Sequence, residues 1–366
     1  MSFKSRQQFT ISMGAGVTQV DVTLTAGQDI TKTVPLLNGT RAANYDTSSV
    51  SVERLGATQY RIKRFASGGT ALSLVLTVLE FTGVTITQVP LTYAGGTVVT
   101  AAVAIGTMSR TWAVSYQSSG DAFPDGDGVE QMTRTRLIAG PTRVEWTRAA
   151  GTFANPTGFS FVCEDLDGTN WTVQAIDWVL AAVVPLNTAI AAVDPTRTFF
   201  VGTHHMEDVF GALEERGATA TLIGTATHRA THNSANLAVR TGHTFVVQVP
   251  AGQAFVQRVT GTMAGGVLSE TLALGVPVSG NSVVVYSSSP GGVEGAGSNN
   301  SALFNDQPAR ECLLGTLPTA LSVKTERSNS SSQTIYAAEV IDWLGGSIGG
   351  EDDGPIRTCC GVMIPP

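Results

Sequence analysis

Charged residues are scarce in this chain. Lys and Arg together number 22 and Asp and Glu 29 among 366 residues, so charged side chains make up 14% of the sequence and the formal net charge is −7. No run of five or more basic residues occurs. Proteins that bind the phosphate backbone of nucleic acids need concentrated positive charge, so we expect no nucleic-acid partner.

Long apolar runs are also absent. The longest one, Trp178–Leu186, is about half as long as a helix that spans a bilayer. The stretch MSFKSRQQFTISMGAG at positions 1–16 lacks the apolar core of a secretory signal peptide. We therefore expect no membrane segment, and synthesis and assembly in the cytoplasm.

The sequence lacks the common catalytic and cofactor-binding motifs. It contains no G-x-S-x-G elbow, P-loop, H-E-x-x-H motif or dinucleotide fingerprint. Ser, His and Asp do not stand in phrases typical of a catalytic triad. We therefore predict that the protein is not an enzyme and that it has no catalytic residues and no cofactor.

Cysteine is rare, with four residues in the whole chain: Cys163, Cys312, Cys359 and Cys360. This number is too low for a disulfide-framework fold, and the C-x-x-C spacing of a zinc site is missing. What the chain does have is 40 glycines and much Thr, Ser and Val. Such a composition is typical of β-strands joined by tight turns, so we predict an all-β fold.

Short phrases recur along the chain in a fixed order, which indicates internal repeats. The first phrase reads TQVDVTLTAGQ from Thr18, TQVPLTYAGGT from Thr87, VQAIDWVLAAV from Val173 and VQRVTGTMAGG from Val256. Each phrase has a Gln at its start, namely Gln19, Gln88, Gln174 and Gln257. The second phrase appears as ITKTVPL from Ile30, MSRTWAV from Met108, PTRTFFV from Pro195 and SGNSVVV from Ser279.

Two further phrases complete each repeat. One is a strand with a basic residue, whose equivalents we predict to be Arg64, Arg148, Arg229 and Arg327. The other is a closing apolar strand that ends at Phe81, Asp165, Pro250 and Trp343. These phrases alternate apolar and polar residues and are separated by Gly and Pro, as half-buried strands are.

The repeat length matches a small β-sandwich. We predict four tandem β-sandwich-like modules at 1–83, 84–168, 169–252 and 253–345, followed by a Gly-rich, cysteine-bearing C-terminal tail at 346–366. Modules joined by short linkers favour an extended or arched subunit. In the third module, MEDVFGALEERG at 206–217 has apolar residues at helical spacing, which predicts a short inserted helix.

Two other insertions consist of turn and loop residues: DAFPDGDGVEQ in module 2 and SSSPGGVEGAGSNNSALFNDQ in module 4. The first offers Asp125, Asp127 and Glu130 as oxygen ligands, but it lacks the full calcium-loop pattern. A solvated turn is therefore favoured over a calcium site.

The histidines are concentrated in module 3. They comprise His204, His205, His228, His232 and His243. His228 and His232 would share one face of a helix, as metal ligands do, but the surrounding sequence is typical of strand and turn. Adjacent strand residues also point to opposite faces, so ordinary polar positions are favoured and we predict no metal site.

The phrases VLEF from Val78, VIDW from Val340 and VDPTRT from Val193 resemble those of repeated β-domains in the virion proteins of tailed bacteriophages. The resemblance spans nearly the whole chain. It implies a structural role in the neck, collar, tail or head surface, with other copies of the chain and other virion proteins as partners. It implies no catalytic residues.

The tail suggests how copies could be joined. We hypothesise intersubunit disulfides from Cys359 or Cys360 to Cys163 or Cys312 of a neighbour, formed after lysis because the cytosol is reducing. Free thiols are the alternative. Aromatic residues leave a second function open, because tryptophans can stack on sugar rings of a host surface glycan, as in a receptor-binding fibre or adhesin. Core packing is favoured for them: Trp112, Trp146, Trp171, Trp178 and Trp343 lie mostly in apolar repeat phrases.

Overall fold

A computed structural model describes most of the chain. The described residues are 3–25, 27–40, 50–64, 71–118, 133–140, 142–148, 156–181, 185–206, 218–232, 239–264, 267, 269–286, 291–293, 314–326, 333–345 and 347–348. They form β-strands and connecting turns, together with three short 3-10 turns, η1 (Ile30–Lys32), η2 (Met108–Arg110) and η4 (Pro195–Arg197). The predicted all-β class is confirmed.

Six strands recur in each module. Module 1 contains β1 (Phe3–Met13), β2 (Gln19–Thr23), β3 (Thr33–Thr40), β4 (Val50–Leu55), β5 (Gln59–Arg64) and β6 (Leu72–Phe81). Module 2 contains β7 (Val84–Thr92), β8 (Val98–Ala102), β9 (Thr111–Ser118), β10 (Arg134–Ile138), β11 (Arg143–Thr147) and β12 (Thr157–Asp165).

Modules 3 and 4 repeat this order. Module 3 contains β13 (Thr172–Leu180), β14 (Leu186–Ala189), β15 (Thr198–Met206), β16 (Ala218–Ile223), β17 (Thr227–His232) and β18 (Arg240–Gln248). Module 4 contains β19 (Ala254–Met263), β20 (Ser269–Ala273), β21 (Ser282–Tyr286), β23 (Leu314–Thr319), β24 (Ser322–Glu326) and β25 (Gln333–Trp343), with the short β22 (Gly291–Val293) added to β25. A final strand, β26 (Ser347–Ile348), follows module 4.

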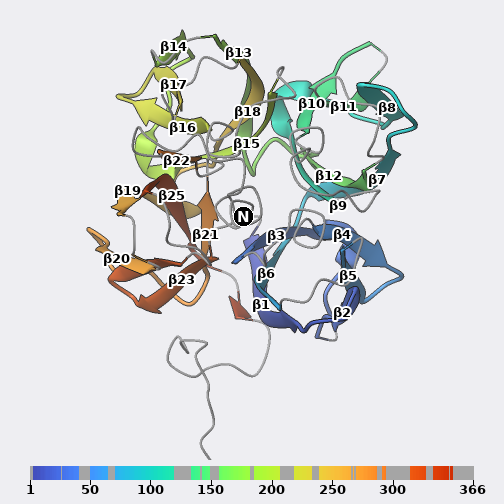
Figure 1. The fold of residues 1–366 in the computed structure, drawn as a ribbon, viewed down its shortest axis with the longest axis horizontal. Helices are drawn as coiled ribbons and strands as arrows, with labels where there is room; N and C mark the ends of the chain where they lie inside the picture. The colour runs from blue at the N-terminus through green and yellow to red at the C-terminus, as the bar shows by residue number, and fades with distance from the viewer. Residues whose placement is uncertain are drawn as a thin grey trace, which may run out of the picture.

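Each module is a sandwich of two antiparallel sheets. The first, last and third strands form one sheet, in the orders β1-β6-β3, β7-β12-β9, β13-β18-β15 and β19-β25-β21. The second, fifth and fourth strands form the other, in the orders β2-β5-β4, β8-β11-β10, β14-β17-β16 and β20-β24-β23. We call these the inner and outer sheets, because the first kind lies nearer the centre of the molecule (Figure 1).

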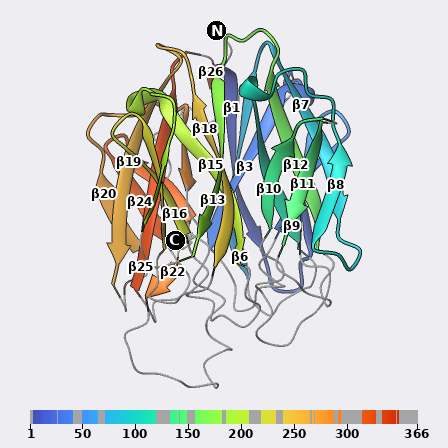
Figure 2. The same cartoon turned by 90° about the horizontal axis from the view of Figure 1, so that it is seen from above.

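The four modules form a closed ring, which differs from the expected extended or arched subunit. They are arranged around a common centre in Figure 1, and Figure 2 shows that their strands run roughly along the axis of the ring. The fourth strand of each module contacts the inner sheet of the next, in the pairs β4 with β9, β10 with β15, β16 with β25 and β23 with β3. The last of these contacts closes the ring.

The inner sheets are buried on both faces, because each lies between its own outer sheet and a neighbouring module. Their central strands are therefore buried almost throughout, as in β6, where nine of ten residues are buried. The outer strand β8 instead alternates exposed and half-buried residues. A tight turn leads from the last strand of each module to the following segment, and in every case it holds a glycine at positive φ: Gly83, Gly168, Gly252 and Gly345.

The chain direction gives the ring two distinct ends. The 3-10 turns, the hairpins between fourth and fifth strands, and the turns between modules lie at one end, which we call the turn end. The third strand of each module finishes at the opposite end, beside the start of the last strand: Thr40 pairs with Ser73, Ser118 with Thr157, and Met206 with Arg240. The predicted insertions in modules 2, 3 and 4 follow those third strands, so their attachment points share this second end, the insertion end.

Aromatic side chains from all four modules meet at the turn end and form what we call the aromatic hub. Five of them make a closed cycle of edge-to-face contacts, with interplanar angles of 74–90°. The order of the cycle is Phe81, Trp171, Trp112, Phe199 and Trp343. Phe3 stacks on Trp343 at 5.5 Å between ring centroids. Edge-to-face pairs are favourable beyond the area they bury, so the hub ties the modules together.

The predicted helix at 206–217 lies outside the described residues except for Met206, which ends β15. The other two predicted insertions lie outside them apart from Gly291–Val293, which form β22.

Candidate functional site

The polar chemistry of the inner sheets repeats from module to module. In each module, a polar side chain near the end of the last strand accepts a hydrogen bond. The donor is a main-chain N–H in the segment that leads into the third strand. The four pairs are Glu80 with the N–H of Asp29, Glu164 with that of Gly106, Gln248 with that of Asp194, and Asp342 with that of Ser279. Side chains thus satisfy these main-chain amides, which fixes the turn.

A glutamine in the first strand makes a second repeated tie. The side-chain oxygens of Gln174 and Gln257 accept hydrogen bonds from the N–H groups of Ala191 and Val276, and their amide groups donate to the carbonyls of the same residues. In module 1 the side-chain oxygen of Gln7 accepts from the N–H of Thr25. The register against the last strand makes Gln7, Gln174 and Gln257 equivalent, since they face Val78, Val246 and Val340.

Two predicted equivalences are therefore wrong. Gln19 lies in β2, the second strand of module 1, and Gln88 faces Phe161. Thr87 occupies the equivalent position in module 2, facing Val162.

The equivalence of Arg229 with Arg64 and Arg148 is also wrong. Counted from the hairpin, Arg229 corresponds to Arg61. Arg61 pairs with Asp21 across the sheet at 2.8 Å between Nε and Oδ1, and Arg229 donates to Asn187 at the same distance. Arg64 and Arg148 instead donate from Nε to the carbonyls of Val17 and Gly96. Arg327 lies outside the described residues.

The joint between modules 3 and 4 contains a buried ion pair. Arg258 Nε lies 2.8 Å from Glu339 Oε1, and the carboxylate also accepts from the N–H of Phe200 at 2.6 Å. The guanidinium donates to the carbonyls of Pro195 and Thr198 in module 3 and lies over the Phe200 ring. Burial raises the pKa of Glu339, while Arg258 and the Phe200 N–H act in the opposite direction.

At two other joints an arginine side chain donates to the carbonyl that is equivalent to that of Pro195. Arg54 of β4 donates to the carbonyl of Ile30 at 2.8 Å and to that of Ile86 in module 2 at 3.0 Å. Arg6 of β1 donates to the carbonyl of Gly280 at 2.7 Å across the joint that closes the ring. These carbonyls occupy equivalent positions, because each belongs to the residue that directly follows the N–H bound by a side chain of the last strand. The three residues are Ile30, Pro195 and Gly280. A guanidinium therefore recognises the same turn at three joints.

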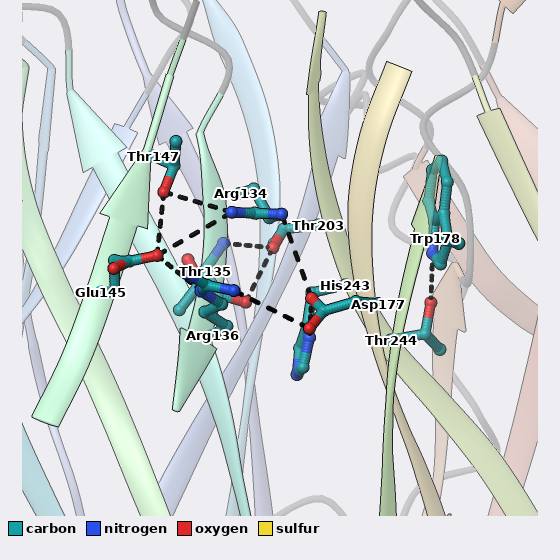
Figure 3. Close-up of polar contacts among 10 residues, drawn as sticks. All are labelled: Arg134, Thr135, Arg136, Glu145, Thr147, Asp177, Trp178, Thr203, His243 and Thr244. Atoms are coloured by element: carbon teal, nitrogen blue, oxygen red, sulfur yellow. Dashed lines mark hydrogen bonds and ion pairs between the residues drawn. The ribbon is translucent and has the colours of Figure 1, made fainter. Parts of the chain in front are cut away.

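The joint between modules 2 and 3 carries a larger polar cluster, drawn in Figure 3. Arg136 Nε lies 2.5 Å from Glu145 Oε1, and Arg134 and Arg136 approach the carboxylate of Asp177 at 4.0 and 3.8 Å. Asp177 Oδ1 lies 2.9 Å from Nδ1 of His243. The hydrogen bond with His243 is the largest factor that lowers the pKa of Asp177; burial opposes it, and the two arginines add to it. The Asp177 side chain is 54% exposed.

Asp177, His243 and Thr203 lie in one row across the inner sheet of module 3. This order suggests a triad, but the geometry does not provide one. Thr203 Oγ1 accepts from the N–H of Thr135 at 2.7 Å and so joins β15 to β10. In Figure 3 the His243 ring extends away from Thr203. The row therefore acts as a joint between modules.

All five tryptophans are buried, with exposed fractions between 0% and 5%. Trp178 donates to Thr244 Oγ1 at 3.0 Å (Figure 3). Its ring packs against Gly242. A Cβ atom at position 242 would lie 2.0 Å from the ring, so only glycine fits there. Trp146 donates to Ser160. Core packing is confirmed for these residues, and in this structure their rings are not accessible to a sugar.

Cys163 is fully buried at the centre of β12. Leu79, Val247 and Ile341 occupy the equivalent positions in the other modules, so Cys163 takes the place of an apolar core residue. Burial raises the pKa of its thiol. A neighbour's tail cannot reach this sulfur while the sandwich is closed, which is a correction to the hypothesised pairing. Cys312, Cys359 and Cys360 lie outside the described residues.

His228 is fully buried beside the Phe200 ring, at 5.6 Å between centroids. Neither of its ring nitrogens has a hydrogen-bond partner within the described part of the chain. Burial lowers its pKa to about 4. Tyr60, Val144 and Val323 occupy this core position in the other modules. The sequence contains one signal of this burial, since His228 aligns with Tyr60 when the two hairpins are superposed.

In the described residues, no three His, Cys, Asp or Glu side chains gather as a metal site requires. His204, His205 and His232 are strand residues. Asp125, Asp127 and Glu130 lie outside the described ranges. The described part of the chain also contains no helix long and apolar enough to cross a membrane.

No protein family, curated protein or solved structure matches this chain.

Proposed function

We propose that this protein is a structural component of a tailed-bacteriophage virion, in the neck, collar, tail or head surface, that assembles into a symmetric oligomer and stabilises the particle. Its partners are other copies of itself and other virion proteins, and it acts in the virion after synthesis in the host cytoplasm. It binds through its surface, without a catalytic centre, a metal or a nucleic acid.

The observation that carries this proposal is the closed ring of β-sandwiches with polar ties at every joint. Charged and polar side chains bind at the joints: Arg258 and Glu339 bind main-chain groups, and Asp177 and His243 bind each other and face β10. A subunit built this way is a rigid block whose outer surface is available for assembly. Residues Cys312, Cys359 and Cys360 remain the proposed sources of intersubunit disulfides.

A receptor-binding fibre or adhesin that recognises a host glycan is the alternative, and one observation favours it. The attachment points of the three insertions share the insertion end of the ring, as a single recognition surface requires. The buried tryptophans cannot contribute to such a surface, so a glycan would have to be held by the insertions themselves.

Mass spectrometry of purified particles, without reduction and after mild cross-linking, tests the proposal. Recovery of the chain in stoichiometric amounts, cross-linked to other virion subunits, supports a structural role. Absence of the chain from particles would contradict it. Low copy number, with binding to a glycan array that is lost when 121–131 is replaced by a short Gly-Ser turn, would instead support the adhesin.

A further inference from the structure

The pairing of β26 with β1 differs from the other strand pairings in the described residues. It is parallel, with Ser5 beside Ser347 and Arg6 beside Ile348. It also joins a segment that follows module 4 to the first strand of module 1, whereas the other described ladders lie within one module. β26 thus adds a strand to the edge of an already complete inner sheet.

On the β1 side of this pairing, side-chain contacts with the rest of the ring fix the residues of the strand. Ser5 Oγ donates to Glu80 Oε2 at 2.9 Å, and Lys4 Nζ lies 2.8 Å from Glu80 Oε1. Arg6 is fixed to the carbonyl of Gly280. The edge of β1 is therefore preorganised to receive a strand, which lowers the entropy lost when one binds.

The β26 side is attached loosely. The last described tie to module 4 is the hydrogen bond from the N–H of Leu344 to the carbonyl of Gln253, after which Gly345 takes a positive φ of 79°. The ladder itself covers only Ser347 and Ile348. Since a ladder this short makes few hydrogen bonds, and each has a small net contribution to stability, this strand can be released at low cost.

We propose that β26 exchanges between copies, so that the C-terminal strand of one chain adds to the β1 edge of a second. The local contacts are the same in both arrangements, as in domain swapping. The ring stays closed during the exchange, because the aromatic hub and the bond from Arg6 to Gly280 do not involve β26. This inference rests on the proposed assembly function and names the segment and the edge that link neighbouring copies.

Concentration decides which arrangement forms. A short connection in the chain gives the intramolecular strand an effective concentration of about millimolar. Dilute copies therefore keep their own β26, and exchange is favoured when packing in a particle brings copies to comparable local concentrations. The freshly made protein would remain monomeric until assembly.

Disulfide trapping tests the exchange. Adjacent strands lie about 4.8 Å apart, which is within the Cα separation of a disulfide. Two full-length variants, S5C and S347C, are made with Cys312, Cys359 and Cys360 replaced by Ser; the buried Cys163 is retained. The two are mixed and oxidised over a range of concentrations, and any bond between positions 5 and 347 in the mixture must join two chains.

We expect a heterodimer whose yield rises with concentration toward the millimolar range, while a chain that carries both substitutions closes on itself when dilute. Ser12, an exposed residue farther along β1 that pairs with Ser73, provides the control: S12C mixed with S347C should give only background. Failure of the heterodimer at every concentration, or absence of the intrachain bond, would overturn the exchange. Sedimentation of the unaltered protein reports assembly separately, so loss of exchange with retained oligomers leaves the proposed function standing.

Discussion

The joint between modules 3 and 4 and the joint between modules 2 and 3 occupy equivalent places in the ring but use their charges differently. At the first, the Glu339 carboxylate is buried, and both it and Arg258 bind main-chain groups of module 3. At the second, the carboxylate that Arg134 and Arg136 approach is that of Asp177, whose side chain is 54% exposed. Water can therefore solvate the Asp177 carboxylate if its partners are lost, whereas the Glu339 carboxylate is shielded from water. The comparison predicts that burial of the carboxylate, more than the number of charges, decides how much a joint depends on an ion pair.

Removing Arg258 should have the largest effect. Arg258→Ala leaves Glu339 buried without its cation, and breaking a buried pair from one side destabilises by about 3–5 kcal/mol. Urea unfolding at neutral pH measures the loss. The double variant Arg258→Met with Glu339→Leu serves as the control, because it removes both charges and should lose less than the single variant. Equal losses would show that the desolvated carboxylate is not the cause.

His228 should make the same region sensitive to acid. Its pKa is about 4 in the folded protein and 6.5 in the unfolded chain, so the unfolded chain takes up the proton first as the pH falls. Protonation of His228 therefore has no effect on stability above about pH 6.5 and lowers the free energy of unfolding between pH 6.5 and 4, by up to about 3 kcal/mol. A protonated His228 would also lie on the same Phe200 ring as Arg258.

The variant His228→Val, which introduces the residue found at this position in modules 2 and 4, should remove this part of the acid sensitivity. The difference between variant and parent, measured by denaturant unfolding at pH 7.5, 5.5 and 4.5, isolates His228 because Glu339 is common to both. A difference that does not change with pH would contradict the assignment.

Asp177→Asn should have a small effect, about 1 kcal/mol or less, because half-exposed pairs are screened by solvent. The pKa of Asp177 is lowered in the folded protein, so its contribution is present above the ordinary carboxyl pKa and is lost as the pH falls through the folded value. Unfolding of variant and parent should therefore differ at pH 7 and converge at strongly acidic pH. A loss as large as that of Arg258→Ala would remove the distinction between the two joints.

The surface pair of Arg61 and Asp21 should matter least. Both side chains are solvated on the outer face of module 1, and exposed pairs often contribute nothing measurable. We expect Arg61→Ala to leave the thermal midpoint unchanged within error, as should Arg229→Ala at the equivalent position in module 3. A clear shift would indicate that this face contacts something in the unfolded or assembled protein.

Sequence patterns predicted the strands and repeats because alternation of apolar and polar residues is a local property. They could not show which strands of different modules are equivalent, since alternating strands resemble one another in sequence. TQVDV at Thr18 looks like TQVPL at Thr87, yet only pairing with the last strand shows that Gln7 and not Gln19 is the equivalent of Gln174. The ring, the hub and the polar joints depend on contacts between distant modules, and no local pattern records these.

The aromatic hub has a consequence for how the chain gains and loses structure. In a linear array of repeats, terminal units can fray independently because each contacts only its neighbours. Here every ring of the cycle contacts rings of another module, so removing any module exposes aromatic surface belonging to at least one other. We therefore expect a single unfolding transition seen alike by tryptophan fluorescence and far-ultraviolet circular dichroism, and no stable one-module fragment. A protein divided into four by its sequence is one cooperative unit.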